Sequence, residues 1–307
     1  MADILYEVLP LELNLRAAPK VNPRNILTRL RQGQTVRQLA PATAAGWLQV
    51  QADVQGTAVT GFAKASFLKR LTSPQQVPSP PVVLPNIPEA RLPSPSPVRR
   101  NSASAGARVF DLTEANQPGR PGPTPADQAQ QLGSIIAYLA VDRSARYAPG
   151  AGRTFCNIYA HDYCHLAGTY LPRVWWTRKA LVVLAAGQAV KPAYGTTVQE
   201  LNANSLYQWL DEFGPDFGWR RSVDLTEVQQ AANSGQVCII CAQRRDLNTP
   251  GHIVAVVPET SAHRAKRVGE RVTTPLMSQA GAQNFQYGGR VWWTGAQFAR
   301  FGFWIHA

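Results

Sequence analysis

The chain has 307 residues, a length that suggests two domains more readily than one. Its formal net charge of +12 favours an anionic polymer as partner, either a nucleic acid or the acidic wall of a bacterium. The sequence contains no glycine-rich phosphate loop, no zinc-finger spacing and no aromatic RNA-binding motif, so it favours the wall and predicts no nucleic-acid partner.

The N-terminal stretch, MADIL, lacks a basic segment followed by an apolar core. The sequence therefore predicts no signal peptide, and it contains no apolar run long enough for insertion into a membrane. We expect synthesis in a cytoplasm. Action on a wall would then follow export by a non-Sec route, injection, or lysis of the cell.

Residues 3–71 contain short β-like runs separated by turns, a spacing that predicts a small barrel. The runs read LNLRAAP, LRQGQTV, GWLQV and TGFA in chain order. This order resembles the bacterial SH3-like domain. The resemblance implies a small all-β SH3-like barrel over residues 1–71 that binds the wall or the adjoining catalytic domain. Trp47 is the candidate for contact with the wall, and core packing is the alternative role for Trp47 and Phe62.

Residues 72–126 hold 13 of the 24 prolines, with Ser, Gln and Gly between them. Proline removes backbone donors and excludes helix geometry, and the stretch has too little apolar mass for a core. It therefore predicts an extended, flexible linker. Two short apolar runs, at 82–84 and 109–112, are the places where this linker would dock on a domain.

The second domain is expected over residues 127–307, and helices come first in it. Apolar residues at helical spacing predict a helix over 127–142. A capping box predicts another over 197–213, and a further capping signal predicts one from Asp224 that ends at Gly235.

Three strand-like runs follow, at 237–242, 252–258 and 274–281. Helices first and an antiparallel sheet afterwards is an α+β layout. The first run contains Cys238 and Cys241, which stand three residues apart and so point to opposite faces of a strand. We expect both to be packing residues, with neither a disulfide nor a metal site between them.

Cys156 and His252 are the candidate reactive pair. Apolar spacing predicts a helix over 156–166 with Cys156 at its first position and Gly168 as its stop. Unpaired N–H groups and the helix dipole lower the pKa of a thiol there and favour the nucleophilic thiolate. His252 opens a strand, where its side chain can enter a cleft. Cysteine first and histidine later is the order of papain-like thiol enzymes, whereas a small buried hydrophobe is the alternative interpretation of Cys156.

The runs TFCNIYAHDYCHLAG and GHIVAVVP resemble the NlpC-type and CHAP-type cysteine amidases and peptidases that cut peptidoglycan. The resemblance covers residues 127–307 and implies a papain-like catalytic domain. The Asp-Cys-Ser-Gly form of the NlpC core is replaced here, because Phe155 precedes the cysteine and Asn157 follows it. The resemblance also implies that the upstream Tyr147 contacts substrate. Asn157 and Asp162 are expected to be structural or substrate-anchoring residues.

The third residue of such a site orients the imidazole. Gln279 is the prediction, because small residues beside it leave room for the ring; Asn284 and Glu259 are the alternatives. Cys156 would attack an amide carbonyl and His252 would carry the proton to the leaving amine. The backbone N–H of Cys156 would contribute to the oxyanion hole. The reaction requires neither a metal nor a cofactor.

His161 and His165 are the rival candidates for the general base. At 3.6 residues per turn, His161 is rotated by roughly 140° from Cys156 around the helix. His165 lies on the correct face but about 13 Å along the axis. Neither is expected to reach the sulfur from the same helix.

The sequence thus predicts a peptidoglycan hydrolase, an amidase or endopeptidase that cleaves an amide bond of the stem peptide. It would act as a phage lysin or as a secreted antibacterial toxin. Bacterial peptidoglycan is the expected partner, and a toxin would also meet secretion machinery and an immunity protein. One alternative is a papain-like protease or acyltransferase that acts on a protein in a target cell. The other is a non-catalytic wall-binding protein, which predicts no thiolate at position 156.

Overall fold

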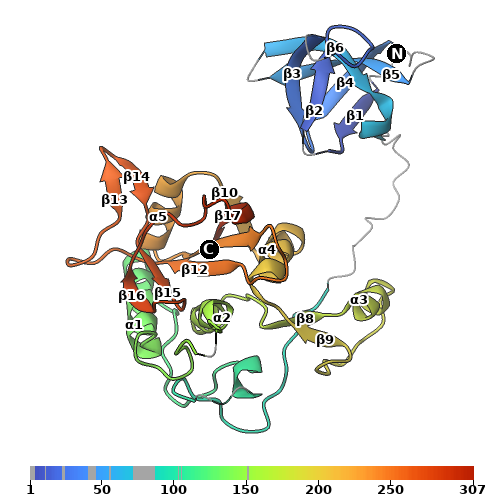
Figure 1. Cartoon of the computed structure of the whole chain (residues 1–307). Helices are drawn as coiled ribbons and strands as arrows, with labels where there is room; N and C mark the ends of the chain where they lie inside the picture. The colour runs from blue at the N-terminus through green and yellow to red at the C-terminus, as the bar shows by residue number, and fades with distance from the viewer. Residues whose placement is uncertain are drawn as a thin grey trace. The chain divides into compact units, whose positions relative to one another are not determined.

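The structure is a computed structural model of the chain, which forms two compact units, Met1–Val82 and Val83–Ala307 (Figure 1). It describes residues 4–10, 12–22, 25–40, 46–54, 57–71, 87–102, 104, 106–150 and 152–307. Within these ranges, none of the helices has the length and apolar character needed to cross a membrane.

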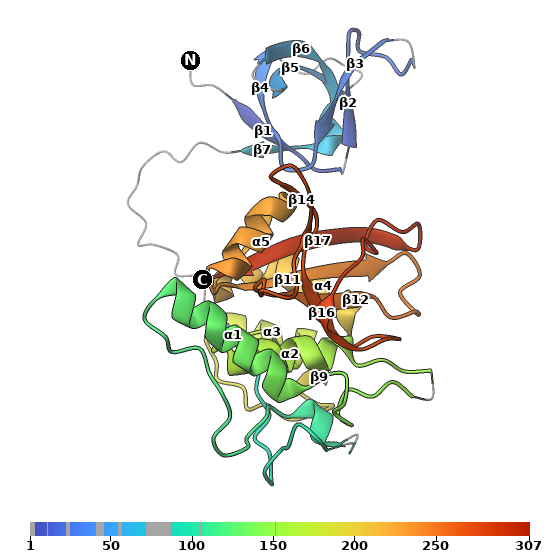
Figure 2. The same ribbon diagram turned by 90° about the vertical axis from the view of Figure 1, so that its left-hand side faces the viewer.

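The first unit is one antiparallel sheet of seven strands that curls around its own apolar core (Figure 2). Its elements are β1 (Leu5–Val8), β2 (Glu12–Arg16), β3 (Ile26–Arg31), β4 (Thr35–Ala40), β5 (Trp47–Val54), β6 (Thr57–Lys64), η2 (Ala65–Phe67) and β7 (Leu68–Leu71). The strand order is β3-β2-β6-β5-β4-β1-β7. Among the described residues no pairing of β3 with β7 closes a barrel, so the SH3-like barrel stays a prediction.

Alternation along the strands explains this core, because successive side chains of a strand point to opposite faces. Leu13 and Leu15 of β2 and Val50 and Ala52 of β5 are buried, and each pair is separated by one less buried residue. Gly33 adopts a positive φ of 78° in the turn between β3 and β4. The run that begins at residue 30 is therefore two strands joined by a glycine turn.

The second unit is an α+β domain built on a six-stranded antiparallel sheet of order β10-β17-β11-β12-β15-β16. Its helices are η3 (Gly106–Val109), α1 (Pro125–Leu139), α2 (Cys156–Leu166), α3 (Arg178–Ala185), α4 (Ala203–Glu212), η4 (Gly214–Phe217) and α5 (Leu225–Asn233). The strands of the main sheet are β10 (Trp219–Ser222), β11 (Val237–Arg244), β12 (His252–Val256), β15 (Met277–Gln279), β16 (Phe285–Gly288) and β17 (Phe298–His306). Two small sheets pair β8 (Val174–Trp176) with β9 (Val198–Glu200) and β13 (Lys266–Val268) with β14 (Arg271–Thr274). The α+β prediction is confirmed.

Helices cover both faces of this sheet, with α1 and α2 on one side and α5 on the other (Figure 2). The central strand β11 is therefore buried on both faces. Ile239 and Cys241 pack into the core that contains α1, α2 and α4, whereas Cys238 and Ile240 pack into the core that contains α5. The prediction that the two cysteines of this strand point to opposite faces is confirmed.

The helix predicted over 197–213 begins later than its capping box suggests. Residues 198–200 form β9 and pair with β8, which removes them from the helix. Helix α4 begins at Ala203 instead, after Asn202, whose side chain accepts a hydrogen bond from the Ser205 N–H at 3.0 Å. The later asparagine cap prevails because the preceding residues are engaged in strand pairing.

The described part of 87–126 packs on the second unit and does not form the flexible linker that its prolines predict. Ala90, Val98 and Leu112 are each at most 2% exposed and belong to the core that contains α1 and α2. The short apolar run at 109–112 docks as expected, and its neighbours dock with it. A high proline content does not prevent burial of the apolar side chains between the prolines. Residues 72–86, which include the run at 82–84, lie outside the described residues.

Backbone groups of the docked segment find their partners in side chains of β8 and of the loop that follows α2. The Trp176 indole donates to the carbonyl of Pro88 at 2.7 Å, and the Ala90 N–H donates to the Tyr170 hydroxyl at 2.8 Å. Such hydrogen bonds satisfy polar groups that would otherwise be buried without a partner. The second unit thus extends well upstream of residue 127.

Candidate active site

Cys156 lies where α2 meets β12. It is the first residue of α2, as the sequence predicts, and its side chain is only 4% exposed. The backbone N–H groups of Asn157 and Ile253 hydrogen-bond to its sulfur. One amide donor at the start of α2 and one in β12 stabilise a negative charge on that atom.

His252 is the first residue of β12 and contacts both Cys156 and Gln279. Its imidazole hydrogen-bonds to the Cys156 sulfur. Its Nε2 lies 2.9 Å from Gln279 Oε1. Because Nε2 is engaged by the amide, Nδ1 is the ring nitrogen that remains for the thiol. The structure thus brings together the three residues that the sequence predicts as the catalytic set.

The Gln279 amide has a defined orientation. Its Nε2 donates to the Gln283 carbonyl at 3.0 Å, so Oε1 faces the imidazole as an acceptor. His252 Nε2 therefore carries the donated proton. A Cβ at Gly281 would lie 3.4 Å from His252 Cε1 and 3.1 Å from Gln279 Nε2, which fits the expectation that small residues leave room for the ring.

The two reactive groups shift each other's pKa in the direction that favours charge separation. Burial raises the pKa of Cys156, but the hydrogen bond and charge of His252 outweigh it and hold that pKa below the ordinary thiol value. Burial likewise lowers the pKa of His252, and the contacts with Cys156 and Gln279 outweigh it and raise that pKa above the ordinary value. The arrangement therefore favours a thiolate–imidazolium pair, whose protons titrate jointly.

The remaining cysteines lack this setting. Cys164, Cys238 and Cys241 are free and buried. Burial raises the pKa of all three thiols above the ordinary value. They are packing residues, and Cys156 alone among the four has a lowered pKa.

Two residues that support His252 were not recognised in the sequence. Trp292 packs edge-on against the imidazole, with ring centroids 4.6 Å apart and an interplanar angle of 71°. Asn204 is 4% exposed, and its side chain bonds the Arg244 N–H and the Thr249 carbonyl in the loop before His252. The sequence features that point toward these supports are the Trp-Trp pair at 292–293 and the Pro-Gly pair before His252.

The loop before His252 requires a glycine at position 251. A Cβ at this position would lie 2.4 Å from the Ala242 carbonyl oxygen and 2.5 Å from Asn204 Oδ1. Both distances are far shorter than van der Waals contact. Any larger residue would displace the start of β12, and with it His252.

Tyr147 and Asp162 are buried, so the prediction that Tyr147 contacts substrate is corrected. Both side chains are fully buried, and the Tyr147 hydroxyl donates to Asp162 Oδ2 at 2.8 Å. Asp162 also pairs with the buried Arg146, whose Nε lies 2.6 Å from Oδ2. A substrate needs exposed surface, which neither residue offers. Of the two roles expected for Asp162, the structural one applies.

Asn157 ties the start of α2 to the connection between β9 and α4. Its side-chain Nδ2 donates to the Leu201 carbonyl at 2.8 Å. Its backbone N–H is one of the two donors to the Cys156 sulfur. The structure therefore shows a structural role for the side chain.

The rival bases have other partners. His161 Nε2 lies 3.0 Å from Asp111 Oδ1, and its Nδ1 lies 2.6 Å from the Leu171 carbonyl oxygen. His165 Nε2 lies 3.1 Å from the Leu112 carbonyl oxygen. Both imidazoles hold the docked segment onto α2. Glu259, an alternative third residue, pairs with Arg267 at 2.6 Å.

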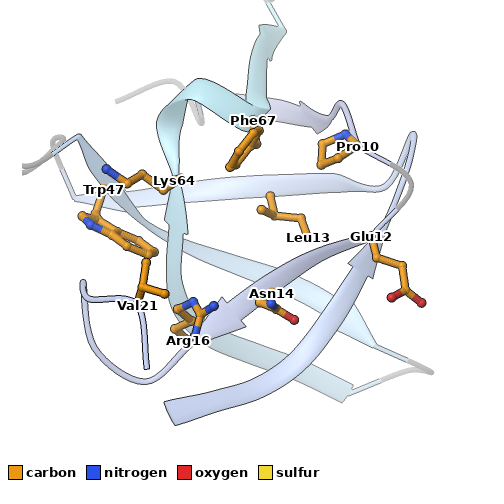
Figure 3. Close-up of a pocket in the computed structure, with 9 residues that line it drawn as sticks. All are labelled: Pro10, Glu12, Leu13, Asn14, Arg16, Val21, Trp47, Lys64 and Phe67. Atoms are coloured by element: carbon orange, nitrogen blue, oxygen red, sulfur yellow. The ribbon is translucent and has the colours of Figure 1, made fainter. Parts of the chain in front are cut away.

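Trp47 lies in the first unit, beside a groove (Figure 3). Its side chain is only 4% exposed, and Lys64 Nζ lies 5.3 Å from its ring centroid. The exposed apolar surface of the groove comes from Phe67 and Val21, which are 47% and 77% exposed. Glu12 lies at the opposite end of the groove from Lys64 (Figure 3). Trp47 thus lines a wall of the groove and offers little exposed ring surface for a ligand to stack on.

In the ranges that the structure describes, no group of three or more His, Cys, Asp or Glu side chains is arranged to hold a metal ion. No family model and no curated protein matches the sequence. Among solved structures, the chain is similar to NlpC2 from Trichomonas vaginalis, at 8% identity over 94% of this chain and 71% of that chain. The TM-score is 0.20, which is too low to carry an argument about fold or activity.

Proposed function

We propose that the second unit is a cysteine hydrolase that cleaves amide bonds through a thioester intermediate. The observation that carries this proposal is the hydrogen-bonded series from Cys156 through His252 to Gln279, with a lowered thiol pKa and a raised imidazole pKa. A nucleophile, a base and a group that orients the base are what acyl transfer requires.

The reaction proceeds in two halves. Cys156 Sγ attacks the amide carbonyl carbon, and the C–N bond breaks as His252 gives its Nδ1 proton to the leaving nitrogen. A thioester then joins the acyl group to Sγ. His252 next takes a proton from water, whose oxygen attacks the thioester and releases a carboxylic acid. The thiolate and imidazolium are restored.

Backbone geometry supplies the electrostatic support for this chemistry. The N–H groups of Asn157 and Ile253 stabilise the thiolate before attack. The N–H of Cys156 is the first of α2 and has no carbonyl partner within the helix, so it is available to the developing oxyanion.

The substrate that we propose is the peptidoglycan stem peptide, cut by an amidase or endopeptidase. The cysteine and histidine motifs and the net charge of +12 support it. A phage lysin or a secreted toxin would reach the wall by lysis, injection or a non-Sec route. A papain-like protease or acyltransferase would use the same three residues on a protein substrate. A non-catalytic wall-binding protein is disfavoured, because it would have no need of the paired thiol and imidazole.

Digestion of purified peptidoglycan by the full chain tests the substrate. We expect new amino groups to appear, and mass spectrometry of the products to show the amide bond that is cut. The Cys156→Ala chain, which keeps every wall-binding surface, is the matched control and should release none. An intact wall, together with cleavage or acylation of a protein by the same preparation, would support the protein-directed alternative instead.

We also propose that the first unit holds the chain on the wall through the groove beside Trp47. Its exposed apolar residues, Phe67 and Val21, suit an extended peptide. In the inactive Cys156→Ala chain, Phe67→Ala should weaken sedimentation with peptidoglycan by about 10-fold, equivalent to ~1.4 kcal/mol. Leu39→Ala is the control, because Leu39 is 43% exposed in the same unit and does not line the groove. Equal binding by the two variants would place the wall contact elsewhere.

A further inference from the structure

We infer that Asn284 is a positioning residue of the active site, which holds Gln279 in the orientation that His252 requires. The inference rests on the proposed function, because it concerns the same three reactive residues. In the described structure, the Asn284 side chain makes no hydrogen bond to any of those three residues. Asn284 acts through the backbone of the turn between β15 and β16.

The side chain of Asn284 joins two segments that are far apart in the sequence. Its Oδ1 accepts from the Gly281 N–H at 2.9 Å, which braces the turn that follows Gln279. Its Nδ2 donates to the carbonyls of Val141 and Tyr147, at 2.9 and 2.8 Å. Val141 and Tyr147 are fully buried, so the far end of this link lies in the core of the second unit. One amide therefore clamps the turn to the frame that leads into α2.

The clamped turn carries the carbonyl that orients Gln279. Gln283 directly precedes Asn284, and its carbonyl accepts from Gln279 Nε2 at 3.0 Å. If the turn moved, this carbonyl would release the amide, and the amide would be free to rotate. A rotated Gln279 would present Nε2 to His252, which would place two N–H donors face to face.

The orientation of this amide decides the protonation of the imidazole. With Oε1 as acceptor, His252 keeps its proton on Nε2 and leaves Nδ1 to exchange a proton with Cys156. With Nε2 as donor, the imidazole would have to present a lone pair there and could not form a stable imidazolium. The thiolate would lose its counterion, and the pKa of Cys156 would rise. Asn284 thus acts on the thiol through two intermediate residues.

The chemistry of asparagine suits this role, whereas a third catalytic residue would need contact with His252. All three contacts of Asn284 are to backbone groups, and they use both its acceptor and its donor. Aspartate of the same shape could accept from Gly281 but could not donate to the two carbonyls. Alanine would lose all three contacts.

The experiment measures the rate of Cys156 alkylation by iodoacetamide against pH, a readout that needs no substrate. We expect Asn284→Ala and Asn284→Asp to move this curve to higher pH, and Gln279→Ala to move it in the same direction. Turnover of peptidoglycan should fall by about 10–100-fold in kcat with KM nearly unchanged. Combining Asn284→Ala with Gln279→Ala should give no further loss, because the first residue acts through the second.

Gln286→Ala is the matched control. Gln286 also links this part of the chain to the segment before Cys156, through a hydrogen bond of 2.7 Å from its side chain to Asp142. Its alkylation curve should match that of the unchanged chain. An unshifted curve in the isosteric Asn284→Asp variant, or additive losses in the double variant, would overturn the inference. Failure of the proposed function looks different, since then Cys156→Ala would retain full turnover whatever the alkylation curves show.

Discussion

Cys156→Ala is expected to lower the rate of amide hydrolysis by at least about 10⁴-fold while the fold of the second unit persists. Alanine removes the only thiol whose pKa is lowered, and with it the atom that forms the thioester. His252→Ala should cause a loss of similar size, because the thiolate then has neither a counterion nor a proton donor for the leaving amine. Turnover of purified peptidoglycan measures the loss, and near-ultraviolet circular dichroism verifies the packing of both variants.

The controls for this result are the other cysteines. Cys164→Ala, Cys238→Ala and Cys241→Ala should keep most of their turnover if they fold, because their thiols are buried and have raised pKa values. In the unchanged chain, activity should rise with pH through the lowered pKa of Cys156 and fall as the imidazolium deprotonates above the ordinary histidine value. Undiminished hydrolysis by Cys156→Ala would end the thiol mechanism.

Asp162→Ala should lower the free energy of unfolding of the second unit by about 3–5 kcal/mol. The reason is that Arg146 would be left as an unpaired cation in a site where both partners are 0% exposed. The Tyr147 hydroxyl would lose its acceptor as well. Urea denaturation of the full chain, followed by a signal from the second unit, gives the value.

An exposed ion pair provides the comparison for Asp162. Asp211 lies 2.7 Å from Arg221, and their side chains are 42% and 46% exposed. Asp211→Ala should cost no more than about 1 kcal/mol, because solvent screens the charges. If Asp162 anchored substrate instead, its variant would unfold normally and show only a raised KM.

The parts of the site that could be predicted from the sequence are those encoded by short-range signals. Helix α2 has the predicted bounds because its apolar spacing lies within eleven residues. His252 opens a strand because a Pro-Gly turn precedes a β-branched run. Gln279 could be chosen because small residues follow it. In each case neighbours in the sequence determine the local structure.

The errors concern contacts between distant segments. Nothing near Asp162 in the sequence indicates that Arg146 neutralises it, so its burial could not be foreseen. The prolines of 72–126 predict a segment without a core of its own, but composition cannot show that Leu112 meets a matching core. Asn204 and Asn284 are ordinary polar residues until the fold brings distant backbone partners within reach: Arg244 lies 40 residues from Asn204, and Tyr147 lies 137 residues from Asn284.

The docked segment also has a consequence for the order of events during synthesis. The first unit can pair all its strands as soon as residue 71 has emerged, because they pair only with one another. Pro88, in contrast, must wait for Trp176, which is 88 residues later. At about 5–20 residues per second this delay is roughly 4–18 s. During that interval the apolar side chains of the segment remain exposed and can form non-native contacts. A nascent chain is therefore most accessible to chaperones and proteases after its first unit has folded and before its second unit has.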